Sequence, residues 1–232
     1  MADMITVDAH TPSPLWPLPQ GIDAAIFDFD GTLAETSWVW RLVDEHFFER
    51  RGLPYTSEVS RELAALGFAP GARFVIQHFG LDEREQDICD EWNADGRELY
   101  EHDVRLRLGA EEYLHALRAA GVPIALATTN APEVIDAMCH VDADALFDER
   151  VHGCEVSRPK HFPDIYVEAA RRLGVEPSHC IVFEDLAVGL RSARSVGMLG
   201  VGVRCDDECQ DLDALRAQSD ILLNDWRDIR LG

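Results

Sequence analysis

Lysine is nearly absent from this chain. Lys160 is the single lysine among 232 residues, although lysine and arginine together number 21. An isolated lysine is usually a solvated surface residue. In a chain that otherwise takes arginine as its cation, however, one lysine suggests a role that a planar guanidinium does not fill. Lys160 also lies between two acidic clusters, at 28–32 and 183–185, and each cluster follows a short apolar run that predicts a strand.

Basic residues are scarce overall. The 43 acidic residues outnumber the basic ones and give a formal net charge of −22. Such a field repels nucleic acids and anionic membrane surfaces, so we expect neither as a partner. The same field opposes phosphorylated ligands. A phosphate site in this chain must therefore overcome it locally with Mg²⁺, a cationic side chain and backbone N–H groups.

Paired cysteines and long apolar runs are also missing. Six cysteines occur without a Cys-x-x-Cys pair, which excludes a dense disulfide framework and predicts reduced thiols. The segment 205–209 has a cysteine at each end, but it lacks a second paired motif, so we interpret it as an acidic surface loop rather than a metal site. No run approaches the roughly 18 apolar residues of a membrane span, and residues 1–20 do not resemble a signal peptide. We expect a cytoplasmic protein.

The order of apolar patterns predicts the organisation of the chain. Residues 1–20 contain four prolines and predict an extended, partly disordered arm that Trp16 pins to the surface. Residues 24–27 predict a buried parallel strand. From about 36 to 103, apolar residues recur three and four apart without a strand candidate, which predicts an inserted unit of three or four helices.

Strands and helices then alternate. Such alternation predicts an α/β fold with a parallel sheet and helices on both faces, and ligands of these sheets bind beyond the carboxyl ends of the strands. The predicted helices are 110–120, 132–140, 163–173 and 188–196, and the predicted strands are 123–127, 150–152, 180–183, 199–203 and 221–223.

The residues that follow the first strand suit phosphoryl transfer. Asp28 is the candidate nucleophile, because a carboxylate can attack phosphorus and divide a hard displacement into two steps. Asp30 would protonate the leaving group and later activate water. Taken alone, Asp-x-Asp-Gly is more often a plain turn, and the accompanying groups decide against that interpretation. Glu184 and Asp185 complete, with both aspartates, a set of hard oxygen ligands for Mg²⁺.

Three further positions complete the candidate site. Thr128 offers a hydroxyl to a phosphoryl oxygen, and Lys160 offers the charge that stabilises the pentacoordinate state. Thr129 and Asn130 would face the substrate or stabilise the loop. The aspartates at 28–30 and the threonines at 128–129 each follow an apolar strand. The sequence therefore predicts that these side chains converge on one edge of the sheet.

Four ordered motifs resemble those of the haloacid dehalogenase superfamily. They are DFDGTL at 28–33, LAT at 126–128, KHFPD at 160–164 and FEDLAVG at 183–189. The resemblance implies a Rossmann-like core, at 21–36 and 104–232, and an all-helical cap at 37–103. It points to the subgroup of β-phosphoglucomutase, phosphoglycolate phosphatase and phosphonatase. His161 and Leu186 depart from the usual motifs, but neither change removes a catalytic group.

The resemblance also narrows the activity. Dehalogenases of the superfamily lack the second aspartate, so Asp30 argues for phosphate chemistry, and phosphonatases use a cap lysine that residues 37–104 do not contain. The mutases have a histidine about ten residues after the second aspartate, where this chain has Trp40. We therefore predict a Mg²⁺-dependent phosphomonoesterase acting on a small phosphorylated metabolite, as a monomer or homodimer.

Two alternatives stay open at this stage: a phosphosugar mutase and a non-catalytic phospho-ligand binder. The cap residues that decide the substrate cannot be identified from the spacing. Arg61 and Arg73 are candidates for binding a distal phosphate or carboxylate, and Trp38 and Trp40 for lining the entrance. Solvated arginines and packed tryptophans are equally good interpretations of these four residues.

Overall fold

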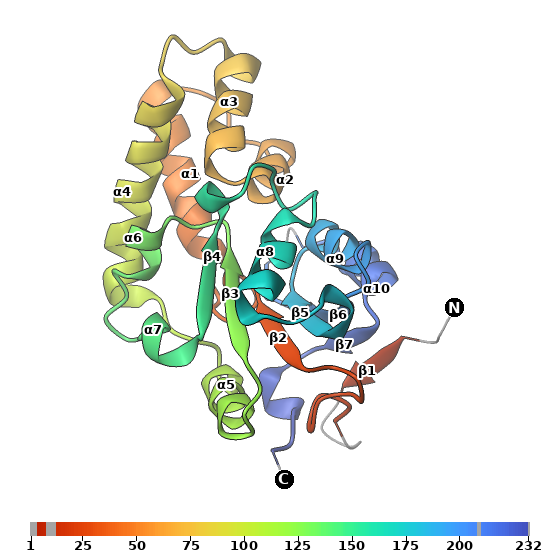
Figure 1. Cartoon of the computed structure of the whole chain (residues 1–232). Coiled ribbons are helices and arrows are strands. Elements are labelled where there is room, and N and C mark those ends of the chain that lie inside the picture. Colours follow the sequence, from red (N-terminus) through yellow and green to blue (C-terminus); the bar gives the residue numbers. More distant parts are fainter. Residues whose placement is uncertain (1–3, 8–12, 208–209, 232) are drawn as a thin grey trace.

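A seven-stranded parallel sheet forms the centre of the protein (Figure 1). The computed structural model describes residues 4–7, 13–207 and 210–231, so part of the predicted arm and the end of the predicted acidic loop, including Cys209, lie outside it. Neighbouring strands follow the order β1-β7-β6-β5-β2-β3-β4. The strands are β1 Ile5–Val7, β2 Ala24–Phe27, β3 Ile124–Thr128, β4 Glu149–His152, β5 Cys180–Glu184, β6 Leu199–Val203 and β7 Ile221–Leu223.

Both faces of the sheet are buried, as the continuous apolar runs predict. In β2, Ala24 and Ile26 pack with helices α8 (Asp164–Leu173) and α9 (Ala187–Arg194). Phe27 points to the other face, where it stacks on Phe183 at 4.6 Å beside α5 (Ala110–Ala119). The α/β sheet with helices on both faces is therefore confirmed.

Four helices stand together above the carboxyl ends of the central strands (Figure 1). They are α1 Ser37–Arg51, α2 Ser57–Leu66, α3 Phe68–Phe79 and α4 Glu85–Asp103. Aromatic side chains fill the interior of this unit, for example Phe47 and Trp92 with ring centroids 5.2 Å apart. The unit occupies the segment where the sequence pattern predicts an all-helical insertion, and we call it the cap.

The N-terminal arm differs from the prediction. Its residues 5–7 form β1, which pairs in parallel with β7 at the edge of the sheet. Leu15 is fully buried, and Trp16 packs edge-on against Tyr113. A three-residue strand is too short for a periodic signal, so only tertiary pairing reveals it.

Short helices are the other difference. The predicted helix 132–140 ends early, as α6 Pro132–Ile135, because the following segment packs on α4 and the Cys139 N–H donates to the Glu101 carbonyl. The remaining helices are α7 Ala143–Leu146, α10 Leu212–Gln218, η1 Gly153–Glu155, η2 Pro177–His179 and η3 Trp226–Asp228. None of the helices in the described ranges has the length and apolar character needed to cross a bilayer.

Candidate active site

The predicted polar groups converge where the sequence places them. The three central strands β5, β2 and β3 are neighbours in the sheet. Their carboxyl ends deliver Glu184, Asp28 and Thr128 to the same edge, because parallel strands all point in one direction. Lys160 reaches this edge from the segment that precedes α8.

Lys160 is a buried cation between two carboxylates. Only 4% of its side chain is exposed. Its Nζ donates hydrogen bonds to Asp28 Oδ1 and, at 2.8 Å, to Glu184 Oε2. Burial opposes the positive charge, but the two carboxylates outweigh burial and raise the pKa of Lys160. Tyr166 donates to the same Glu184 oxygen at 2.7 Å, so the lysine and its partner are fixed in place.

The buried carboxylates around Lys160 carry more negative charge than this one lysine can balance. Ligand oxygens of Asp28, Glu184 and Asp185 lie within 4.8 Å of one another, and all three residues are buried. Burial raises the pKa of Asp28 to about 7, with Glu184 adding to the effect and Lys160 opposing it. Burial and Glu184 also raise the pKa of Asp185. One lysine balances only one of three charges, so this hard-oxygen set fits a divalent cation such as Mg²⁺.

Gly31 permits the close approach within this group. It has φ +73°, and a Cβ at this position would collide with the Asp185 carboxylate. A side chain is therefore excluded on both conformational and steric grounds. The turn that follows Asp28 brings the backbone against a predicted metal ligand.

Asp30 lies outside this group of three carboxylates. Its Oδ1 accepts hydrogen bonds from Thr36 at 2.5 Å, from the Trp40 indole at 3.0 Å and from the Tyr100 hydroxyl. Its Oδ2 accepts from Asn130 Nδ2 at 2.8 Å. Trp40 and Tyr100 belong to the cap, so the predicted acid–base carboxylate is held by both the core and the cap. Its predicted part as a metal ligand stays a prediction.

The loop after β3 faces the same space. Thr128 is buried, and its Oγ1 accepts from the Asn130 N–H at 3.1 Å. Asn130 Nδ2 donates to Tyr100 at 3.0 Å in addition to Asp30. Thr129 is half-buried and borders the cavity described next. The three residues therefore lie at the predicted place, and their catalytic roles stay predictions.

A cavity of about 370 Å³ opens between this edge and the cap, within the usual size range of small-molecule sites, roughly 300–1,000 Å³. The core contributes Lys160 and most of the acidic residues, and the cap contributes Asp44 together with mainly aromatic and polar side chains. Its core lining includes Asp28, Asp30, Gly31, Thr129, Asn130, Lys160, Asp185, Leu186, Asp206 and Asp207, and its cap lining includes Ser37, Trp40, Arg41, Val43, Asp44, Tyr55, Ser60, Leu63, Phe68 and Trp92.

The predicted cap arginines do not reach this cavity. Arg73 is exposed and pairs with Glu85 at 2.6 Å, and Arg61 donates to its own helix at Ser57. Neither lines the cavity. The geometry therefore gives no support to a role of Arg61 and Arg73 in binding substrate. Trp40, by contrast, does line the cavity.

Several functional candidates lack a sequence signal. Tyr100 and Asp44 occupy ordinary helical positions, and only the packing of the cap on the core shows which way they point. Tyr55 lies in the loop between α1 and α2. Tyr166, by contrast, follows Lys160 by six residues at the start of α8, so its proximity to the third motif was a usable signal.

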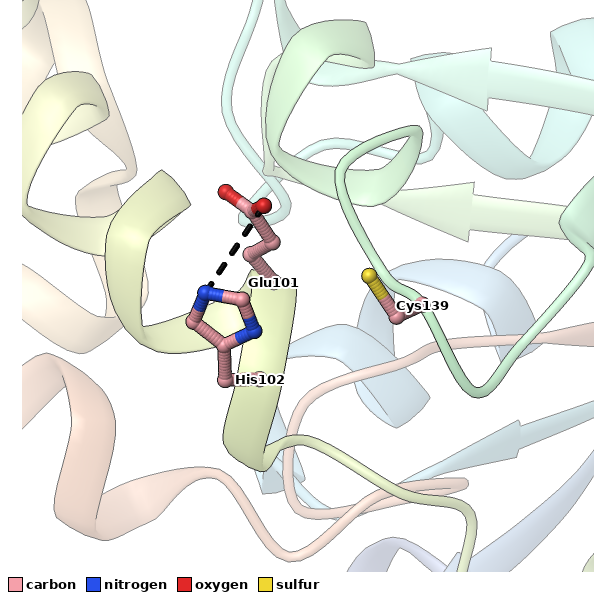
Figure 2. Close-up of side chains that lie close together, drawn as sticks. All are labelled: Glu101, His102 and Cys139. Carbon is pink, nitrogen blue, oxygen red and sulfur yellow. Dashed lines mark ion pairs between the residues drawn. The ribbon is translucent and has the colours of Figure 1, made fainter.

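A second group of possible metal ligands lies at the end of α4 (Figure 2). Ligand atoms of Glu101, His102 and Cys139 lie within 4.8 Å of one another, and Cys139 comes from the segment after α6. His102 and Cys139 are exposed, and none of the three lines the cavity. Among the residues that the structure describes, the ligand group that belongs to the site is therefore the buried set of Asp28, Glu184 and Asp185, which we call the acidic centre.

Comparison with known proteins agrees with the geometry. A family model described as haloacid dehalogenase-like hydrolase matches residues 22–197, which is more than half of the chain. The chain belongs to this family. The resemblance inferred from the four motifs is thereby confirmed.

Similar proteins and solved structures indicate which kind of hydrolase this chain is. It is 33% identical over 180 residues to the probable pseudouridine-5'-phosphatase of Drosophila melanogaster, covering 75% of this chain and 78% of that protein. It is 30% identical to the validoxylamine A 7'-phosphate phosphatase of Streptomyces hygroscopicus subsp. limoneus, covering 89% and 95%. The structure of CbbY from Rhodobacter sphaeroides with xylulose-(1,5)-bisphosphate has a TM-score of 0.77 and 26% identity, covering 91% and 96%. This hydrolase is a phosphatase of small phosphorylated compounds.

Proposed function

We propose that this hydrolase is a Mg²⁺-dependent phosphomonoesterase that acts through an aspartyl-phosphate at Asp28. The observation that carries the proposal is the buried Lys160, which donates to both Asp28 and Glu184 beside a cavity between core and cap. Perturbed carboxylates in such a cavity are typical of catalytic sites.

The residues have distinct roles in the proposed reaction. An oxygen of Asp28 attacks the phosphorus of a bound monoester and forms the acyl phosphate, while the leaving oxygen takes a proton from Asp30. Asp30 then removes a proton from water, which attacks the same phosphorus, releases inorganic phosphate and restores the Asp28 carboxylate. Lys160 and Thr128 stabilise the negative charge on the transferring phosphoryl oxygens.

The acidic centre would hold the metal. Asp28 and Asp185, with Glu184 directly or through water, would supply its protein ligands. When bound, Mg²⁺ supplies positive charge that relieves the repulsion among these carboxylates and stabilises the transferring phosphoryl group.

Phosphate release from a panel of phosphomonoesters, including sugar phosphates, nucleotides and phosphoglycolate, tests this proposal. We expect phosphate release in the presence of Mg²⁺. Most of this release should be lost in EDTA and should return when Mg²⁺ is restored. Release that continues unchanged in EDTA contradicts the metal dependence. A panel in which no ester is hydrolysed contradicts the phosphomonoesterase assignment.

The mutase alternative gains no support from the site. Trp40, at the position of the mutase histidine, presents an indole N–H to Asp30. An indole only donates and cannot exchange a proton as an imidazole does. Product analysis with glucose 1-phosphate separates the two activities, because a phosphatase yields glucose and inorganic phosphate, whereas a mutase yields an isomeric sugar phosphate.

Tyr100 gives a test of the contact between the cap and Asp30. Replacing Tyr100 by phenylalanine keeps the ring but removes the hydroxyl that donates to Asp30 and accepts from Asn130. We expect kcat to fall about tenfold, the scale of one hydrogen bond to a charged group, with a smaller change in KM. Steady-state kinetics on the best ester of the panel measure both.

Tyr113→Phe is the matched control. The Tyr113 hydroxyl is also buried, but it donates to the Leu15 carbonyl, and neither residue lines the cavity. We expect this variant to keep the wild-type kcat. Equal kcat values for Tyr100→Phe and the wild type would show that the hydroxyl does not position Asp30.

A further inference from the structure

Aromatic rings line the cap side of the cavity. Trp40 and Phe68 meet edge to face with centroids 5.3 Å apart, and Phe68 and Trp92 lie 6.2 Å apart. All three border the cavity together with the apolar Val43 and Leu63. Such walls suit a flat or ring-shaped group, which can stack on or against aromatic faces.

A carboxylate, that of Asp44, interrupts these walls. Asp44 is half-buried and accepts a hydrogen bond from Tyr55 at 2.8 Å. It forms no ion pair with any residue in the described part of the chain. Asp44 thus presents to the cavity an acceptor with spare capacity, which suits a group that donates a hydrogen bond.

The charge of the lining argues against a second anionic group on the substrate. Apart from Asp28 and Asp185, four further aspartates border the cavity: Asp30, Asp44, Asp206 and Asp207. The lining cations are Lys160, which is held by two carboxylates, and Arg41. Arg41 is 65% exposed and lies 3.9 Å from Glu45. A distal phosphate or carboxylate would therefore meet mainly negative charge.

We propose that the cap side of the cavity binds an uncharged ring that donates a hydrogen bond to Asp44, so the substrate is a monophosphate of nucleoside type. Bisphosphates and phosphorylated carboxylic acids are disfavoured. The inference rests on the proposed function, because the phosphate of the same molecule must reach Asp28.

The environment of Asp44 supports a binding role. Burial raises its pKa to about 7, Tyr55 opposes the shift and Glu45 adds to it. Arg41, on the same helix, is the nearby lining cation. Because the folded-state pKa lies above that of the unfolded chain, ionisation of Asp44 destabilises the fold as the pH rises from about 4 to 7. A carboxylate that lowers stability at neutral pH is typical of a functional site.

Kinetics with two matched substrates test the proposal. Uridine 5'-monophosphate and ribose 5-phosphate share the phosphorylated sugar and differ by the base. We expect kcat/KM for the nucleotide to exceed that for ribose 5-phosphate by about tenfold or more, the scale of a hydrogen bond to a charged group. Asp44→Asn should reduce this ratio severalfold. A ratio near one, a preference for fructose 1,6-bisphosphate, or a ratio unchanged by Asp44→Asn would overturn the proposal.

Controls separate this inference from the proposed chemistry. Glu49→Gln removes an exposed carboxylate of the same helix that does not line the cavity and should keep the ratio, and Tyr55→Phe should reduce it. Asp44→Asn should melt at a higher temperature than the wild type at pH 8, with no such gain near pH 4, so loss of folding does not explain its effect.

Calorimetric binding to Asp28→Asn provides a readout without turnover. Tighter binding of uridine 5'-monophosphate than of ribose 5-phosphate, lost when Asp44→Asn is added, supports the subsite even if no ester is hydrolysed. Equal binding of the two ligands would overturn it.

Discussion

Asp28→Asn is expected to abolish phosphate release while leaving the fold intact. The amide is close in size to the carboxylate but cannot form the acyl phosphate, so turnover should fall by roughly 10⁴-fold or more, the scale found when a covalent nucleophile is removed. The variant also loses a buried carboxylate whose pKa is already raised to about 7. Its melting temperature should therefore stay close to that of the wild type.

Asp23→Asn provides the matched control for this substitution. Asp23 precedes the same strand, is exposed and pairs with His179 on the surface. We expect it to retain wild-type turnover. Substantial release by Asp28→Asn, measured with the same ester under saturating Mg²⁺, would contradict the assignment of Asp28 as the nucleophile.

Lys160→Met is expected to lower both activity and stability. The methionine fills a similar volume but leaves Asp28 and Glu184 buried without their cation. Removing one partner of a buried ion pair typically destabilises a protein by about 3–5 kcal/mol. The loss of a charge directed at the transferring phosphoryl group should lower kcat by roughly 10²–10³-fold. Denaturant unfolding and phosphate release measure the two effects separately.

Two variants define what Lys160 contributes. Lys160→Arg keeps the charge, but a buried guanidinium needs more room and a different donor geometry, so its activity should also be severely impaired. Arg158→Met removes an exposed cation that lies two residues before Lys160 and pairs with Asp164, and its effect on stability should stay within about 0.5 kcal/mol. Wild-type rates in Lys160→Arg would contradict a specific role for the lysine.

The chemistry of the site could be predicted from the sequence because it depends on strand ends. Asp28, Thr128 and Glu184 each follow or end an apolar run, and parallel strands place such residues at one edge of the sheet. The scarcity of lysine then singled out Lys160. No knowledge of packing was needed for these residues, since local pattern and topology were sufficient.

The cap side of the site could not be predicted in this way. Tyr100 and Asp44 lie on amphipathic helices whose spacing shows which side is apolar but not how the cap sits on the core. Arg73 was chosen for its charge, yet it pairs with Glu85 on the surface. Interhelical packing decides these positions, so a single sequence leaves the leaving-group side of the cavity undetermined.

The arm and the short helices were missed for a related reason. The strand at 5–7 forms only through pairing with β7, and the segment after Ile135 leaves the helical path where it packs against α4. In both places a tertiary contact outweighs a weak local preference.

Capture of the phosphorylated intermediate tests the central claim most directly. The enzyme would be mixed with Mg²⁺ and its best ester, quenched in acid during turnover and reduced with borohydride, which converts an aspartyl-phosphate to homoserine. Mass spectrometry of the peptide that spans residues 24–33 should then show homoserine at position 28, and the Asp28→Asn enzyme should show none. An unmodified Asp28 in an enzyme that turns over rapidly, or a phosphorylated group elsewhere in the chain, would contradict the proposed mechanism.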